Sequence, residues 1–85
     1  MLDAHRTAMW IPISEPGGIP KYYRQHAGAY SIRRVLEPVA AGRRLEKRWA
    51  LYWKNKRLWE LQAMPDLSAA MEQAECWLLE QGIVK

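Results

Sequence analysis

The feature that most constrains this fold is the strict alternation of apolar and polar side chains over residues 47–54, KRWALYWK. Trp49, Leu51 and Trp53 fall on one side of this segment, and the residues between them fall on the other. A period of two is typical of a half-buried β-strand with one wet face. The chain is therefore expected to contain a sheet that is covered on one face only.

A second alternating run follows at residues 57–64, RLWELQAM, with Trp59 on its apolar side. Between the two runs, Asn55 and Lys56 are placed for a tight turn, because Asn tolerates a positive φ. The two runs therefore predict an antiparallel β-hairpin.

An amphipathic helix is predicted over residues 66–82. Asp66 is a suitable N-cap, and Gly82 is placed to end the helix in the left-handed conformation. The apolar residues recur at helical spacing and form one stripe, which comprises Leu67, Ala70, Met71, Ala74, Trp77 and Leu78. A helix with one apolar face needs a sheet to pack on.

The N-terminal half is less regular. Residues 29–37, AYSIRRVLE, predict a further strand, and residues 38–46 predict a basic loop. Residues 21–26 are compatible with a short strand or a turn of helix. Residues 9–13 predict an edge strand or an extended arm, because Pro12 has no N–H for a central ladder.

The predicted fold class is α+β, with a three-stranded antiparallel sheet packed on one C-terminal helix and an N-terminal extended arm. A chain of 85 residues is too short for two cores, so a single domain is expected. Its parts are an arm and loop (1–20), basic strands and a hairpin (21–64) and an acidic helix (66–82).

The chain has five Trp and four Tyr but no Phe, so a few large rings must supply much of the core. Trp49, Trp53, Trp59 and Trp77 are predicted to lie on the inward faces of the hairpin and the helix. Trp10, on the arm, is expected to be the freest: it would pack against the sheet edge or dock into a second copy, so a homodimer is one alternative.

Charge is separated along the chain. Residues 21–57 contain eleven Lys or Arg and two Glu, a net charge of +9, whereas residues 66–82 contain four acidic residues and no Lys or Arg. If the helix covers one face of the sheet, the other face and its loops hold the positive charge. Such a patch would attract phosphates, although exposed charges can also serve solubility or edge protection alone.

No catalytic set, metal site or cofactor site is predicted. Cys76 has no base beside it and is expected to be a partly buried thiol, and Glu72 and Glu75 are expected on a solvated helix face. His5 and His26 lack partners at ligand spacing. The lone cysteine and the absence of a long apolar run predict a cytoplasmic protein without a membrane segment.

Residues 48–81 resemble the strand-strand-strand-helix modules of phage and mobile-element proteins, in particular the arm-type DNA-binding module of tyrosine recombinases, which is similar to plant AP2 domains. The matching features are Trp49, the turn at residues 54–57, Ala70 and Ala74, and Trp77-Leu78. The usual hairpin glycine is absent. The resemblance implies that the sheet enters the major groove, with contacts from Arg33, Arg48, Tyr52, Lys54 and Arg57.

These observations favour a small non-catalytic protein of phage or mobile-element origin that binds DNA, or RNA, through a basic sheet face. The alternative is a protein-binding module, or an inhibitor of a host protein, that uses a sheet edge or a dimer surface. The candidate nucleic-acid-binding residues are Arg33, Arg43, Arg44, Arg48, Tyr52, Lys54, Lys56 and Arg57.

Overall fold

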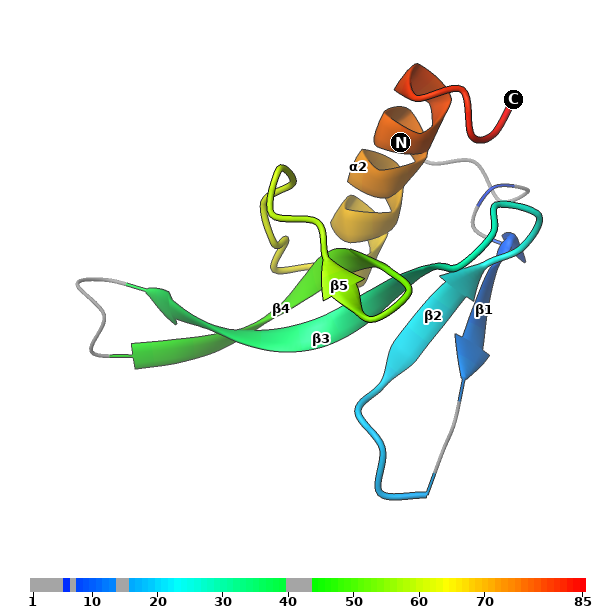
Figure 1. Cartoon of the computed structure of the whole chain (residues 1–85). Helices are drawn as coiled ribbons and strands as arrows, with labels where there is room; N and C mark the ends of the chain where they lie inside the picture. Colours follow the sequence, from blue (N-terminus) through cyan, green and yellow to red (C-terminus); the bar gives the residue numbers. More distant parts are fainter. Residues whose placement is uncertain (1–5, 7, 14–15, 40–43) are drawn as a thin grey trace.

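The computed structural model describes residues 6, 8–13, 16–39 and 44–85. Within them, an antiparallel five-stranded sheet packs on one C-terminal helix, which confirms the α+β class (Figure 1). The predicted number of three strands is wrong, because two N-terminal segments, residues 10–13 and 21–24, also join the sheet. Neighbours in the sheet follow chain order: β1 (Trp10–Ile13), β2 (Lys21–Arg24), β3 (Tyr30–Val39), β4 (Arg44–Trp53) and β5 (Lys56–Arg57).

The N-terminal segment forms the edge strand of the sheet. β1 pairs only with β2, with Pro12 opposite Tyr22. The backbone N–H of Gln25 bonds to the carbonyl of Met9 at 2.8 Å, so the backbone groups of Trp10 and Pro12 point away from β2. The missing N–H of Pro12 therefore removes no ladder bond.

Strands β3 and β4 form a long two-stranded ribbon that projects beyond the helix (Figure 1). The predicted basic loop over residues 38–46 is wrong, because Pro38 pairs with Leu45 inside the ribbon. The backbone N–H of Arg34 donates to the carbonyl of Pro20, so it points to the β2 side of β3. Pro38 lies four residues later in the same strand, so its backbone nitrogen points to the same side. Its missing N–H thus faces an open edge.

The predicted second hairpin strand over residues 57–64 is largely wrong. β5 ends at Arg57, and the chain continues as a loop that is tied back to β4 by paired backbone bonds of 2.8 Å between Trp49 and Met64. The turn itself lies at Lys54 and Asn55, one residue earlier than predicted, and the residue with positive φ (56°) is Lys54.

Replacing Lys54 by glycine is expected to stabilise the protein by about 1 kcal/mol, because a non-glycine residue in the left-handed region is strained. Thermal unfolding followed by circular dichroism should show a midpoint raised by roughly 4–8 °C. Lys56→Gly, in the neighbouring strand, is the matched control and should lower the midpoint. A lower midpoint for Lys54→Gly would contradict the assignment of strain.

Helix α2 spans Leu67–Glu80 and ends as the sequence indicates. Gly82 has a φ of 72°, its N–H bonds to the carbonyl of Leu79, and the N–H of Ile83 bonds to that of Leu78, which together form a Schellman motif. Asp66 is the N-cap residue, but its side chain makes no cap hydrogen bond. Among the described residues, no helix is long and apolar enough to cross a membrane.

The core lies between α2 and the sheet. The predicted helix stripe is confirmed: each member is buried or packs against the buried cluster. Tyr22 meets Trp49 edge to face at 5.8 Å, and Tyr30 meets Trp77 at 5.9 Å. The buried cluster comprises Trp10, Ala27, Ile32, Leu51, Ala70, Met71, Ala74, Leu78 and Val84.

Two of the predicted core tryptophans lie at the surface. The exposed fraction is 40% for Trp53 and 75% for Trp59, whereas Trp10, expected to be the freest, is 3% exposed. Lys54 lies over the Trp53 ring and Arg57 over the Trp59 ring, so both rings are partly shielded by cations instead of by α2.

Candidate nucleic-acid interface

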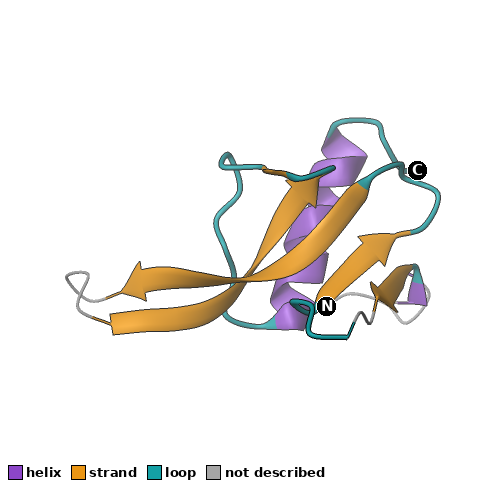
Figure 2. Cartoon of the chain, turned by 60° about the horizontal axis from the view of Figure 1, so that its bottom comes forward, coloured by secondary structure: helices purple, strands orange, loops and turns teal. Residues whose placement is uncertain are grey.

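The sheet has one face turned away from α2, which we call the open face (Figure 2). Directly paired residues of neighbouring strands lie on the same side of a sheet, so the register identifies its members. Ser31 pairs with Tyr52, Arg33 with both Lys21 and Ala50, and Tyr52 with Arg57. The open face of β2 to β5 comprises Lys21, Tyr23, Ser31, Arg33, Val35, Glu37, Arg44, Glu46, Arg48, Ala50, Tyr52 and Arg57.

Arg33 stands near the middle of the open face. Its guanidinium lies over the Tyr52 ring, 4.7 Å from the centroid. Its Nε donates to Oγ of Ser31 at 3.1 Å, and Nη2 donates to the Lys54 carbonyl at 2.7 Å and to Oδ1 of Asn55 at 3.3 Å. Arg33 is thereby held flat on the sheet and anchors the β4–β5 turn.

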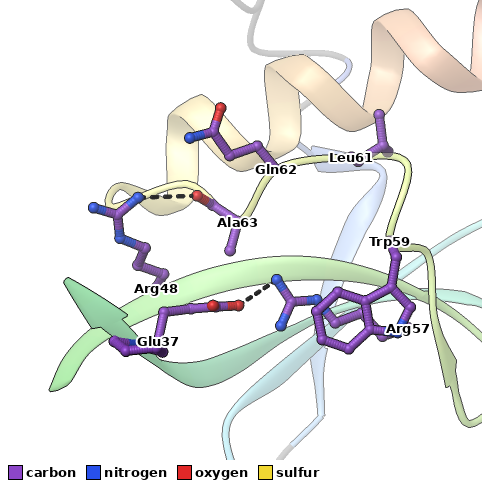
Figure 3. A pocket seen from close by; sticks show the side chains of 8 residues that line it. Glu37, Arg48, Arg57, Trp59, Leu61, Gln62 and Ala63 are labelled. Atoms are coloured by element: carbon purple, nitrogen blue, oxygen red, sulfur yellow. Dashed lines mark hydrogen bonds and ion pairs between the residues drawn. The ribbon is translucent and has the colours of Figure 1, made fainter. Parts of the chain in front are cut away.

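A pocket of about 450 Å³ opens further along this face, between the ribbon and the loop that follows β5 (Figure 3). We call it the Trp59 pocket; its lining includes Glu37, Arg48, Arg57, Trp59 and Gln62. The Arg57 guanidinium lies 3.9 Å from the centroid of the Trp59 ring and pairs with the Glu37 carboxylate (Figure 3).

Arg48 closes one end of the Trp59 pocket. Its Nη1 donates to the carbonyl of Ala63 at 3.4 Å, and its Nη2 pairs with Glu46 at 3.2 Å. The Nε atoms of Arg48 and Arg57 are buried and have no hydrogen-bond partner among the described residues. Both glutamates of the open face are thus paired with arginines, while each of these arginines keeps an unused donor.

The structure places five of the predicted binding residues on the side of the open face: Arg33, Arg44, Arg48, Tyr52 and Arg57. Lys54 lies in the turn beside it and lines a hollow together with Lys21 and Arg33. Lys56 does not belong to this face, because it pairs with Trp53 on the helix side. Arg43 lies outside the described residues.

The residues of this surface that the sequence does not predict include Lys21, Tyr23, Glu37 and Trp59. Lys21 and Tyr23 alternate along β2, but only the register with β3 reveals which side they take. Of these residues, Trp59 has the clearest signal in the sequence. It stands two residues after Arg57, at the end of a strand, where the guanidinium can reach its ring.

The acidic residues of α2 lie on the other side of the sheet. Asp66, Glu72 and Glu80 are exposed. Glu75, predicted to be solvated, is instead 2% exposed and pairs with Arg24 and Arg6, because the apolar stripe turns it toward the sheet. Cys76, predicted to be partly buried, is exposed. The exposed carboxylates of the helix therefore lie away from the open face, although the helix side of the sheet also carries the exposed Lys47 and Lys56.

No family model matches this chain, and comparison with curated proteins and with solved structures finds no similar protein.

Proposed function

We propose that this protein is a non-catalytic protein that binds nucleic acid on its open face, and that its ligand is DNA. The observation that carries the proposal is the stacking of Arg33 on Tyr52 and of Arg57 on Trp59, side by side on a sheet surface that no helix covers.

Each of these stacks presents a flat cation and a flat ring together. A guanidinium held against a ring keeps its remaining N–H groups in a fixed plane, where they can reach phosphate oxygens or base edges. The described residues contain four such cation–ring pairs, whereas a chain of this length has on average about one. Two of the four, Arg33 with Tyr52 and Arg57 with Trp59, belong to the open face, which supports a surface suited to flat, anionic ligands.

The charge distribution supports the same ligand. Phosphates are attracted to the open face, and the exposed carboxylates of Asp66, Glu72 and Glu80 would repel a strand that approached α2. Glu37 and Glu46 each offset the charge of the arginine with which they pair, so the net positive charge of this face comes from Lys21, Arg33 and Arg44.

The shape of the ribbon favours a duplex. A two-stranded antiparallel ribbon has the width of the DNA major groove, and the β3–β4 ribbon projects freely from the body (Figure 1). Arg44 and Lys47 are exposed near its end, where they could contact the phosphates that flank the groove.

The test is a fluorescence-anisotropy titration of a labelled DNA duplex at salt concentrations from about 25 to about 200 mM, a range over which phosphate contacts change the affinity strongly. We expect binding at low salt, with log Kobs falling against log[salt] at a slope of about −3 to −4, as about four phosphate contacts would give. The corresponding single strand and an RNA duplex serve as comparison ligands. If none of the three binds at the lowest salt concentration, the proposal is wrong.

A protein partner is the second candidate, and the ribbon is the observation that favours it. Leu36 and Leu45 are 60% and 61% exposed on the helix side of the sheet, in the part of the ribbon that projects beyond α2. Exposed leucines beside an unpaired strand edge are suited to strand addition. A partner recovered from a nuclease-treated lysate by the wild-type chain, but not by Leu36→Lys, would support this candidate over the first.

A further inference from the structure

A hollow of about 220 Å³ lies beside Arg33, between β2, the start of β3 and the β4–β5 turn. We call it the Arg33 hollow. The described residues that line it include no carboxylate, and its polar lining comprises Lys21, Tyr23, Ser31, Arg33, Lys54 and Asn55. A wall of cations and hydrogen-bond donors favours an anion with several acceptor oxygens.

The guanidinium of Arg33 is fixed before any ligand arrives. It lies on the Tyr52 ring, its Nε is bonded to Ser31, and its Nη2 is bonded to the β4–β5 turn. The bond to the Lys54 carbonyl lies at the exposed surface, so a ligand can reach this guanidinium. No hydrogen bond is assigned to Nη1 within the described part of the chain. Nη1 is therefore an oriented donor, and binding to it costs little side-chain entropy.

The turn supplies a second donor and an adjustable cation. Oδ1 of Asn55 accepts from Nη2 of Arg33 at 3.3 Å, which leaves its Nδ2 amide directed elsewhere on an exposed residue. The exposed Lys54 ammonium lies over the Trp53 ring, 4.7 Å from the centroid. A cation–ring contact at an exposed site is weak, so Lys54 can turn toward the rim of the hollow at little cost.

We propose that the Arg33 hollow binds one phosphate group of the nucleic acid backbone. This inference rests on the proposed function and fixes the position of one phosphate on the open face. Nη1 of Arg33 and Nδ2 of Asn55 would each donate to a phosphate oxygen, and Lys54 would neutralise the charge from the rim.

The size of the hollow and the directions of its donors favour phosphate over other ligands. About 220 Å³ is below the usual volume of sites for whole small molecules, so a single group fits better than a complete nucleotide. The oxygens of a phosphate are arranged as a tetrahedron and can accept from donors that approach from different directions. The two oxygens of a carboxylate lie in one plane, so an acidic side chain of a protein partner would match the hollow less well.

The experiment titrates the protein with inorganic phosphate, with acetate and with chloride at matched ionic strength. The reporter is the side-chain amide of Asn55, the only asparagine in the chain, followed in ¹H–¹⁵N spectra and assigned by its loss in Asn55→Asp. We expect a saturable shift with phosphate and a dissociation constant on the order of 1 mM, as a few charge-assisted hydrogen bonds would give. Acetate should bind roughly tenfold more weakly, and chloride should give no saturable shift.

Variants connect the affinity to the hollow, with the backbone signals of residues 54–56 as the reporter. Asn55→Asp keeps the shape and the Oδ1 acceptor but replaces the donor by a carboxylate oxygen, so phosphate binding should weaken at least about tenfold. Gln62→Glu, which adds the same charge at an exposed position in the Trp59 pocket, is the matched control and should change the affinity less than about twofold. Arg33→Lys keeps the charge but loses the oriented donor, so it should also weaken binding about tenfold.

A DNA duplex without terminal phosphates connects the hollow to the nucleic acid backbone. It should move the Asn55 amide signal, and saturation with duplex should remove the response to added phosphate. A duplex that binds without moving this signal would overturn the inference and leave the proposed function intact. Equal binding of acetate and phosphate, or equal losses in Asn55→Asp and Gln62→Glu, would also overturn it. A phosphate-selective shift in a chain that binds no oligonucleotide would support an anion site in the hollow but contradict the proposed function.

Discussion

Replacing Glu75 by alanine is expected to lower the free energy of unfolding by about 3–5 kcal/mol, as the loss of one partner from a buried ion pair does. The Glu75 carboxylate accepts from Nε and Nη2 of Arg24, the latter at 3.2 Å, and from Nε1 of Trp10 at 3.0 Å. Arg6 reaches it from the surface at 3.1 Å. The substitution would leave the Arg24 charge buried and its neighbour Trp10 without an acceptor.

A loss of this size is large for so small a protein. A domain of 85 residues typically has a total stability of roughly 4–13 kcal/mol. The cluster also joins the helix to β1 and β2, through Trp10 and Arg24, which lie 65 and 51 positions from Glu75 in the chain. Without it, the N-terminal edge of the sheet should loosen first, because β1 has only one neighbouring strand.

Urea denaturation followed by tryptophan fluorescence will measure the effect. Glu80→Ala, an exposed carboxylate on the same helix, is the matched control and should change stability by less than about 0.5 kcal/mol. The double variant Arg24→Leu with Glu75→Leu should recover part of the loss, because no unpaired charge remains buried. A Glu75→Ala variant within about 1 kcal/mol of the wild type would show that the cluster contributes little.

One member of this buried cluster, Glu75, can be recognised from the sequence. Glu75 lies four residues after Met71 and three before Leu78, so helical spacing alone places it on the apolar stripe. A carboxylate in that position indicates a buried partner. The identity of that partner could not be predicted, because it depends on the packing of β2, a segment for which strand and helix were both open.

In the candidate site too, the positions of some residues follow from the local sequence pattern, whereas those of others depend on packing against distant segments. Alternation along β4 correctly separates Arg48 and Tyr52 from Leu51, because it needs no neighbour. The surface position of Trp59 cannot be predicted from the sequence, because the alternation over residues 57–64 favours a continuous strand with this apolar ring on its inward side. β5 ends at Arg57, and the tryptophan then packs on that cation outside the core.

The combined variant Arg44→Gln with Lys54→Gly is expected to weaken DNA binding on the order of 100-fold at about 50 mM salt, if each cation neutralises one phosphate. Both side chains are exposed, and no hydrogen bond or ion pair of either is assigned in the described structure. Lys54→Gly should also relieve the strained turn, so a loss of binding would not result from unfolding. The magnitude of the salt slope should fall by about 2 in the same titration.

The necessary control changes the net charge equally, but on the other side of the sheet. Ser68→Glu with Gln81→Glu also lowers the charge by two, at exposed positions on α2 and at its C-cap. Because these sites face away from the open face, this variant should keep nearly the wild-type slope, with a small loss from long-range repulsion. Equal losses in the two variants would mean that total charge, and not the open face, determines binding. A loss confined to the first variant would locate the phosphate contacts on the sheet.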